Sequence, residues 1–65
     1  MAPNQILKYF RYDHLPEHLQ MVSREFYILA HRMNDKLLDG PEKSAGLRKL
    51  LEAKDCMVRA SLEKD

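Results

Sequence analysis

The stretch at residues 39–44 constrains this chain most strongly, because it separates two long segments that both have the pattern of helices. Gly40 is expected to take the left-handed conformation that ends a helix. Pro41 cannot continue the first helix, but its fixed φ suits the first position of a second one. Asp39 and Glu42 have the three-residue spacing of a capping box. The stretch therefore predicts the bend of a helical hairpin.

The segment before the bend predicts one amphipathic helix over residues 15–38. Its apolar side chains recur at spacings of three and four, which is the helical period, and Pro16 suits the first helical position. They are Leu19, Val22, Phe26, Leu29, Met33 and Leu37. No glycine or proline interrupts residues 17–38, so the helix is expected to run for about six turns.

The segment after the bend predicts a second helix over residues 41–62. Its apolar face consists of Leu47, Leu50, Leu51, Ala53, Met57, Val58 and Leu62. With a turn at 39–41 and an N-terminal arm at 1–14, the whole chain is expected to form one all-α domain, a two-helix hairpin.

Two helices do not cover two wide apolar faces, which makes assembly into a homo-oligomer the expected source of stability. Chains of 65 residues bury only about 60% of their unfolded surface. Cys56 is the single cysteine, which excludes an intrachain disulfide. The apolar residues expected between chains are Met21, Tyr27, Met33, Leu51 and Val58.

Composition argues against a membrane or a DNA partner. The sequence has no signal peptide and no apolar run near the ~20 residues of a membrane span, so a cytoplasmic protein is expected. The 11 Lys and Arg nearly balance the 10 Asp and Glu, so any anionic ligand must be bound by a local cluster. The second helix mixes Arg48 and Lys49 with Glu52 and Asp55, which suits a phosphate backbone poorly. A DNA-binding regulator remains an alternative.

The N-terminal arm carries the first candidate cluster. Residues 8–14 hold three of the five aromatic residues and three basic or histidine side chains. Interleaved rings and cations can stack a nucleobase and neutralise a phosphate. Phe10 is expected to pack over the helix ends instead, whereas Tyr12 is the stacking candidate because its hydroxyl tolerates water. Lys8 and Tyr9 complete this set of ligand-binding candidates.

Lys43 and Ser44 form the second candidate, because they lie in the first turn of the second helix, where free backbone N–H groups attract anions. The alternative is a well-formed turn with a solvated lysine and serine.

Enzyme chemistry finds no support in the sequence. His14, His18 and His31 have no serine or cysteine partner at a recognised spacing, and no third ligand joins His14 and His18 in a zinc site. Cys56 is expected to be a small core residue. No GxxxxGK phosphate loop is present. We therefore predict a protein that is not an enzyme and that uses no cofactor or metal.

The residues also carry a resemblance that spans roughly residues 8–60. Phe10-Arg11-Tyr12, an apolar helix and Glu42-Lys43-Ser44 precede Leu47, Lys49, Leu50, Glu52 and Ala53. This order resembles the small phage hairpin proteins of the anti-CBASS and anti-Thoeris sponge group. The resemblance implies a helical homo-oligomer, typically a hexamer, that binds cyclic oligonucleotide signals between protomers without cleaving them. Cyclic dinucleotides are the first ligands implied, and some members also bind cyclic trinucleotides in a separate pocket.

The resemblance further implies roles for individual residues. Tyr12 corresponds to a tyrosine that stacks on a nucleobase, and Arg24 to a basic residue of the first helix that contacts phosphate. Glu42-Lys43-Ser44 matches a motif that either contacts the ligand or caps the helix. The implied site of action is the host bacterial cytoplasm, where sequestration blocks CBASS-type antiviral signalling. A structural or protein-interaction helical oligomer is the alternative.

Overall fold

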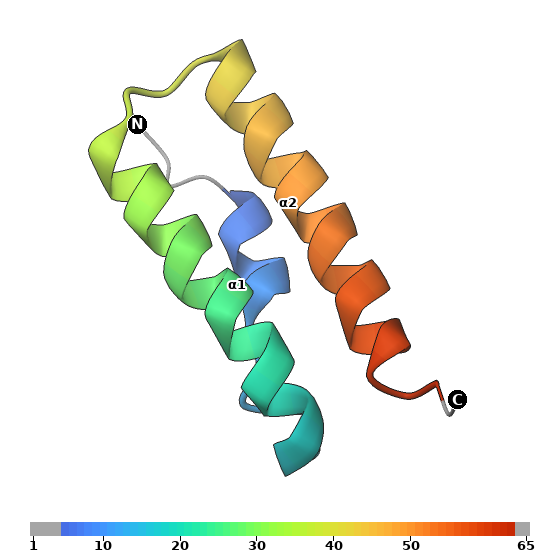
Figure 1. Cartoon of the computed structure of the whole chain (residues 1–65). Coiled ribbons are helices and arrows are strands. Elements are labelled where there is room, and N and C mark those ends of the chain that lie inside the picture. The colour runs from blue at the N-terminus through green and yellow to red at the C-terminus, as the bar shows by residue number, and fades with distance from the viewer. Residues whose placement is uncertain (1–4, 64–65) are drawn as a thin grey trace.

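The computed structural model describes residues 5–63, which form three helical elements. They are a 3₁₀ helix, η1 (Gln5–Phe10), and two α-helices, α1 (Glu17–Lys36) and α2 (Pro41–Ala60). The two long helices run antiparallel as a hairpin (Figure 1). The predicted all-α hairpin is confirmed. Residues 1–4 of the predicted arm and 64–65 of the predicted domain lie outside the described residues.

Both helices are slightly shorter than the sequence predicts. Pro16 has an extended backbone with ψ of 151° and precedes α1 instead of occupying its first helical position. Its carbonyl accepts hydrogen bonds from the backbone N–H groups of Leu19 and Gln20 at 2.9 and 3.0 Å. Pro41 does occupy the first position of α2, as predicted, because its fixed φ suits that position. The carbonyl of Gly40 accepts the N–H of Ser44 at 3.0 Å.

The bend between the helices differs from the predicted glycine turn. Gly40 has a φ of 173°, which is extended backbone and not the left-handed region. The predicted capping box is also wrong, because the Asp39 carboxylate accepts a hydrogen bond from the Lys43 ammonium at 2.8 Å. The same ammonium donates to the carbonyls of Asn34 and Leu37, each at 2.9 Å. A lysine from α2 thus satisfies carbonyls at the end of α1, where the chain turns extended at Leu37.

The 3₁₀ helix η1 makes the arm part of the core. It lies against both long helices, and Phe10 at its end is fully buried (Figure 1). Phe10 forms the buried cluster with Ala30 and Leu47. The partly buried side chains packed on this cluster are Ile6, Leu7, Phe26, Tyr27, Leu50 and Leu51. The prediction that Phe10 packs against the helices is confirmed, but its side chain lies between them with Ala30 and Leu47 and not over the helix ends. Tyr27 and Leu51, which we expected between chains, already pack partly on this cluster within the chain, and their contact with a second chain stays a prediction.

Many apolar side chains remain outside this small core. Leu38 is 94% exposed, Met21 74% and Leu29 42%, so Leu29 lies outside the buried stripe predicted for it. Cys56 is exposed as well, which corrects its expected place in the core. The remaining large exposed apolar side chains among residues 5–63 are Tyr9, Leu37, Met57 and Leu62. This surface is compatible with the predicted homo-oligomer, which stays a prediction.

Candidate ligand-binding site

A shallow hollow lies where η1 passes into the loop before α1. It has a volume of about 350 Å³ and is lined by Lys8, Tyr9, Arg11 and His14. The Lys8 ammonium lies 5.2 Å from the centroid of the Tyr9 ring, within the range of a cation–π contact. The structure therefore brings two predicted site residues, Lys8 and Tyr9, into one hollow with two more side chains able to carry positive charge.

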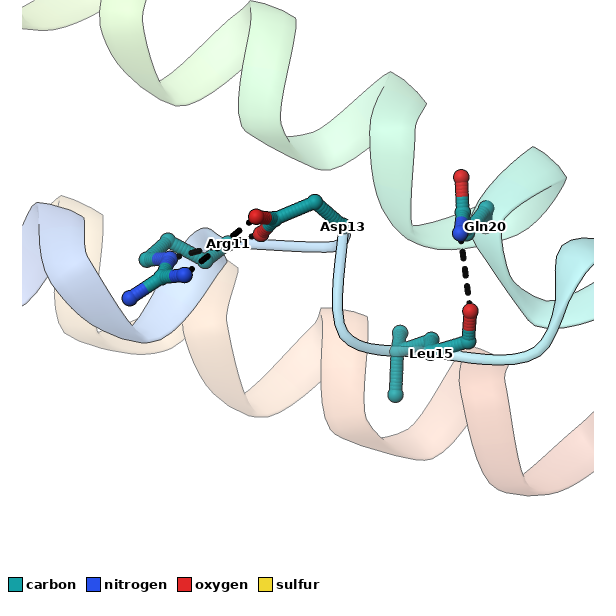
Figure 2. Close-up of polar contacts among 4 residues, drawn as sticks. All are labelled: Arg11, Asp13, Leu15 and Gln20. Carbon is teal, nitrogen blue, oxygen red and sulfur yellow. Dashed lines mark hydrogen bonds and ion pairs between the residues drawn. The ribbon is translucent and has the colours of Figure 1, made fainter.

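Arg11 is partly neutralised by its neighbour Asp13. The guanidinium donates two hydrogen bonds to the carboxylate, both at 3.3 Å (Figure 2). The hydrogen bond from Arg11, followed by a backbone hydrogen bond of Asp13, lowers the pKa of the Asp13 carboxyl below its ordinary 3.8. The same pairing raises the pKa of Arg11. Both side chains are exposed, so an anionic ligand has access to the arginine and competes with Asp13 for it.

The loop that carries these residues is fastened to the start of α1. The side-chain amide of Gln20 donates to the carbonyl of Leu15 at 2.8 Å (Figure 2). The backbone N–H of Leu15 in turn donates to the carbonyl of Tyr12 at 3.0 Å. These two bonds hold the loop from Tyr12 to Leu15 in a defined path beside the helix.

Tyr12 joins a row of rings along α1. Its ring contacts Tyr27 in a T-shaped arrangement, with centroids 5.2 Å apart and planes at 73°. Tyr27 contacts the His31 ring at a centroid distance of 4.3 Å. Arg24 lies three residues before Tyr27 and seven before His31, so these three residues share one face of α1. The predicted pair Tyr12 and Arg24 is thus associated with the same helix face, where Tyr12 is half-buried and Arg24 is exposed.

Lys43 and Ser44 have a different environment from the other candidates. The Lys43 side chain is only 6% exposed, and its ammonium donates to three oxygens of its own chain. The Ser44 backbone N–H is bonded to Gly40 and is not free for an anion, although the residue is exposed. Of the two uses proposed for this motif, the geometry of Lys43 matches helix capping.

Four residues of this region were not among the predicted site residues. Arg11 and His14 line the hollow, and Tyr27 and His31 form the ring row. The interleaving of basic and aromatic residues at 8–14 indicates Arg11 and His14 as further site candidates. The spacing of three and four from Arg24 to Tyr27 and His31 was a signal for the others, but it coincides with the apolar period that predicts core residues.

The described residues hold no cluster of three His, Cys, Asp or Glu side chains that would bind a metal ion. Within residues 5–63, neither long helix is apolar enough over a sufficient length to span a bilayer. No family model matches the chain, and no curated protein or solved structure matches it. The site is therefore interpreted from its own side chains.

Proposed function

We propose that this protein binds cyclic oligonucleotides, cyclic dinucleotides first, and sequesters them without cleaving them. The observation that carries the proposal is the hollow of Lys8, Tyr9, Arg11 and His14, which combines a ring with cationic donors on an accessible surface. Phosphodiesters require such donors, and nucleobases stack on such rings. The site needs neither a nucleophile nor a metal for this role.

The ring row on α1 supplies a second element of the proposed site. Tyr12 offers a stacking surface beside Tyr27, and Arg24 offers a guanidinium for phosphate on the same helix face. The resemblance on Phe10-Arg11-Tyr12 gives these two residues the same roles. The other motif of the resemblance, Glu42-Lys43-Ser44, contributes to the fold through the hydrogen bonds of Lys43. We therefore do not include it in the proposed contact with the ligand.

The hollow is small for a whole cyclic dinucleotide. Its volume of about 350 Å³ is at the lower end of the roughly 300–1,000 Å³ of small-molecule sites. The ligand would extend past the hollow onto a neighbouring protomer, which agrees with a homo-oligomer that forms its pockets between chains. We propose a hexamer on the resemblance, and the host bacterial cytoplasm, where CBASS-type signals are made, as the site of action.

Native mass spectrometry of the full chain with a panel of cyclic di- and trinucleotides tests this function. We expect a discrete oligomer that carries a fixed number of cyclic dinucleotides. After heat denaturation, chromatography should recover the nucleotide intact, because binding involves no chemistry. Linear products would indicate a nuclease, and an absence of bound nucleotide would overturn the proposal.

Two variants test the assigned roles. Tyr12→Ala should weaken cyclic dinucleotide binding about tenfold or more at an unchanged oligomeric state, since a stacked base is worth about 1–3 kcal/mol. Arg24→Ala should weaken binding and make it less dependent on salt, because one phosphate contact is lost. Arg48→Ala removes an exposed arginine from α2 and serves as the matched control. If Tyr12→Ala lowers the melting temperature but leaves the affinity unchanged, Tyr12 has a packing role alone.

A helical scaffold for protein interaction is the second candidate. The exposed apolar side chains on both long helices favour it, since large exposed apolar patches mark contact surfaces. A protein that assembles but shows no nucleotide binding by calorimetry would support this candidate over the first.

A further inference from the structure

The outward face of α1 has features that the proposed ligand site does not use. Leu19, Ser23 and Ala30 are the buried residues of α1 and mark its inner face. Figure 1 shows η1 and α2 on one side of α1, and within residues 5–63 no helix covers the other side. The uncovered side presents Met21, which is 74% exposed, and Leu29.

A recess of about 370 Å³ lies on this side of α1. It is lined by Glu25, Phe26, Ile28, Leu29 and Arg32. Its walls are aliphatic and aromatic, and one acidic and one basic side chain stand at its two ends along the helix. Among residues 5–63, neither Glu25 nor Arg32 forms an ion pair. They lie seven residues apart, about 10.5 Å along the axis, so they do not neutralise each other.

The order of these side chains is self-complementary. Glu25 lies three residues before Ile28, and Arg32 lies three residues after Leu29. If a second α1 lies antiparallel with the twofold axis between positions 28 and 29, Glu25 faces the partner's Arg32 and Arg32 faces the partner's Glu25. Ile28 then faces the partner's Leu29, and the exposed Met21 faces the aliphatic stem of the partner's Lys36.

We propose that this face of α1, defined by Met21, Glu25, Ile28, Leu29, Arg32 and Lys36, binds the same face of a second copy of the chain in an antiparallel, twofold-symmetric pair. The positions of Glu25 and Arg32 favour a second copy of the chain as the partner, because a twofold interface must be complementary to itself. A parallel copy in register would place glutamate beside glutamate and arginine beside arginine, which is unfavourable. The recess provides the space in which the partner's Ile28 and Leu29 side chains pack.

The α1 face forms one interface of the homo-oligomer in the proposed function, and the pairing does not depend on a bound ligand. Every measurement below uses the protein without nucleotide. A failure of the pairing would therefore leave nucleotide binding to be judged separately, and the absence of nucleotide binding would leave the pairing intact.

Charge exchange at the two positions tests the pairing by sedimentation equilibrium at micromolar concentration. Glu25→Arg and Arg32→Glu, each alone, should raise the dissociation constant of the contact at least tenfold, because like charges then face each other. The double variant should recover wild-type association to within a few-fold. Arg48→Glu on α2 makes the same change of charge and should leave association unchanged. A monomeric wild type, or a double variant that associates no better than the single ones, would overturn the proposal.

Zero-length crosslinking tests the register with a conservative variant that preserves the charge. Arg32→Lys places an amine at position 32, and carbodiimide should link it to the Glu25 carboxylate of another chain. Mixing isotopically light and heavy protein distinguishes links between chains from those within one. Mixed-isotope peptides joining positions 25 and 32 are expected. A folded, associated protein that lacks this link would overturn the antiparallel register.

Discussion

Two cation–carboxylate pairs, one at the hairpin bend and one in the loop before α1, look alike in the sequence and differ in the structure. Lys43 and Asp39 are four residues apart, with 2.8 Å between the ammonium and the carboxylate. Arg11 and Asp13 are two residues apart, at 3.3 Å. Lys43 is nearly buried and also binds two backbone carbonyls, whereas both members of the second pair are exposed.

This difference distinguishes a cation that is bound within the fold from one that is accessible to a ligand. A lysine whose three donors are bound to its own chain gains little from an external phosphate, because those bonds would first have to break. An exposed arginine–carboxylate pair contributes little free energy, so the arginine exchanges its partner at little cost. Burial and the number of partners, more than charge or spacing, decide which cation at these two places is free to bind a ligand.

The largest expected effect is at the hairpin bend. Lys43→Met keeps the aliphatic stem but removes the ammonium, and leaves the carbonyls of Asn34 and Leu37 without their donor. We expect a loss of about 3 kcal/mol in the free energy of unfolding, measured by urea denaturation at fixed protein concentration. Ser44 is the next residue and is exposed, so Ser44→Ala should change the free energy of unfolding by no more than about 0.5 kcal/mol. If the lysine variant were as stable as wild type, the distinction between the two pairs would fail.

An intermediate effect is expected at the exposed pair. Arg11→Ala should weaken cyclic dinucleotide binding about tenfold, while stability changes little. Calorimetry measures the affinity, and Arg48→Ala on α2 controls for the loss of one positive charge. Equal effects of the two substitutions would point to general electrostatic attraction and not to the hollow.

The smallest expected effects come from Asp13. Asp13→Asn removes the internal competitor of Arg11, so affinity for an anionic ligand should rise by a few-fold, and a fall in affinity would contradict this.

The pH dependence of stability follows the same pairing. Because Arg11 lowers the pKa of Asp13 in the folded chain, the pair stabilises the fold above the ordinary pKa of 3.8 and ceases to do so as the pH falls through the lowered value. Acid titration followed by circular dichroism should show this small loss below pH 3.8 in wild type and not in Asp13→Asn.

Much of the fold was predictable because it depends on local chemistry. The period of three and four along both segments predicts two amphipathic helices, and the fixed φ of Pro41 sets the start of α2. The end of α1 was not predictable in this way. Gly40 has the residue type of a left-handed cap, but the carbonyls at that end are taken by Lys43, which reaches back from the next helix.

Less of the candidate site was predictable. The basic and aromatic cluster at residues 8–14 identifies Lys8 and Tyr9 from sequence alone, and the structure gathers them in one hollow with Arg11 and His14. The same reasoning treats Lys43 as an equal candidate, since residue type does not reveal how many partners a side chain has. Tyr27 has the spacing of a core residue, and its contact with the Tyr12 ring depends on the path of the loop.

The two helices and the start of the second at Pro41 follow from the sequence alone, because backbone preferences and the hydrophobic period act within a few residues. The central position of Phe10 in the core, the three hydrogen bonds of the Lys43 ammonium and the accessibility of Arg11 depend on the tertiary fold. Each of these depends on segments distant in sequence meeting in space, where burial and competing partners set the energy of a side chain.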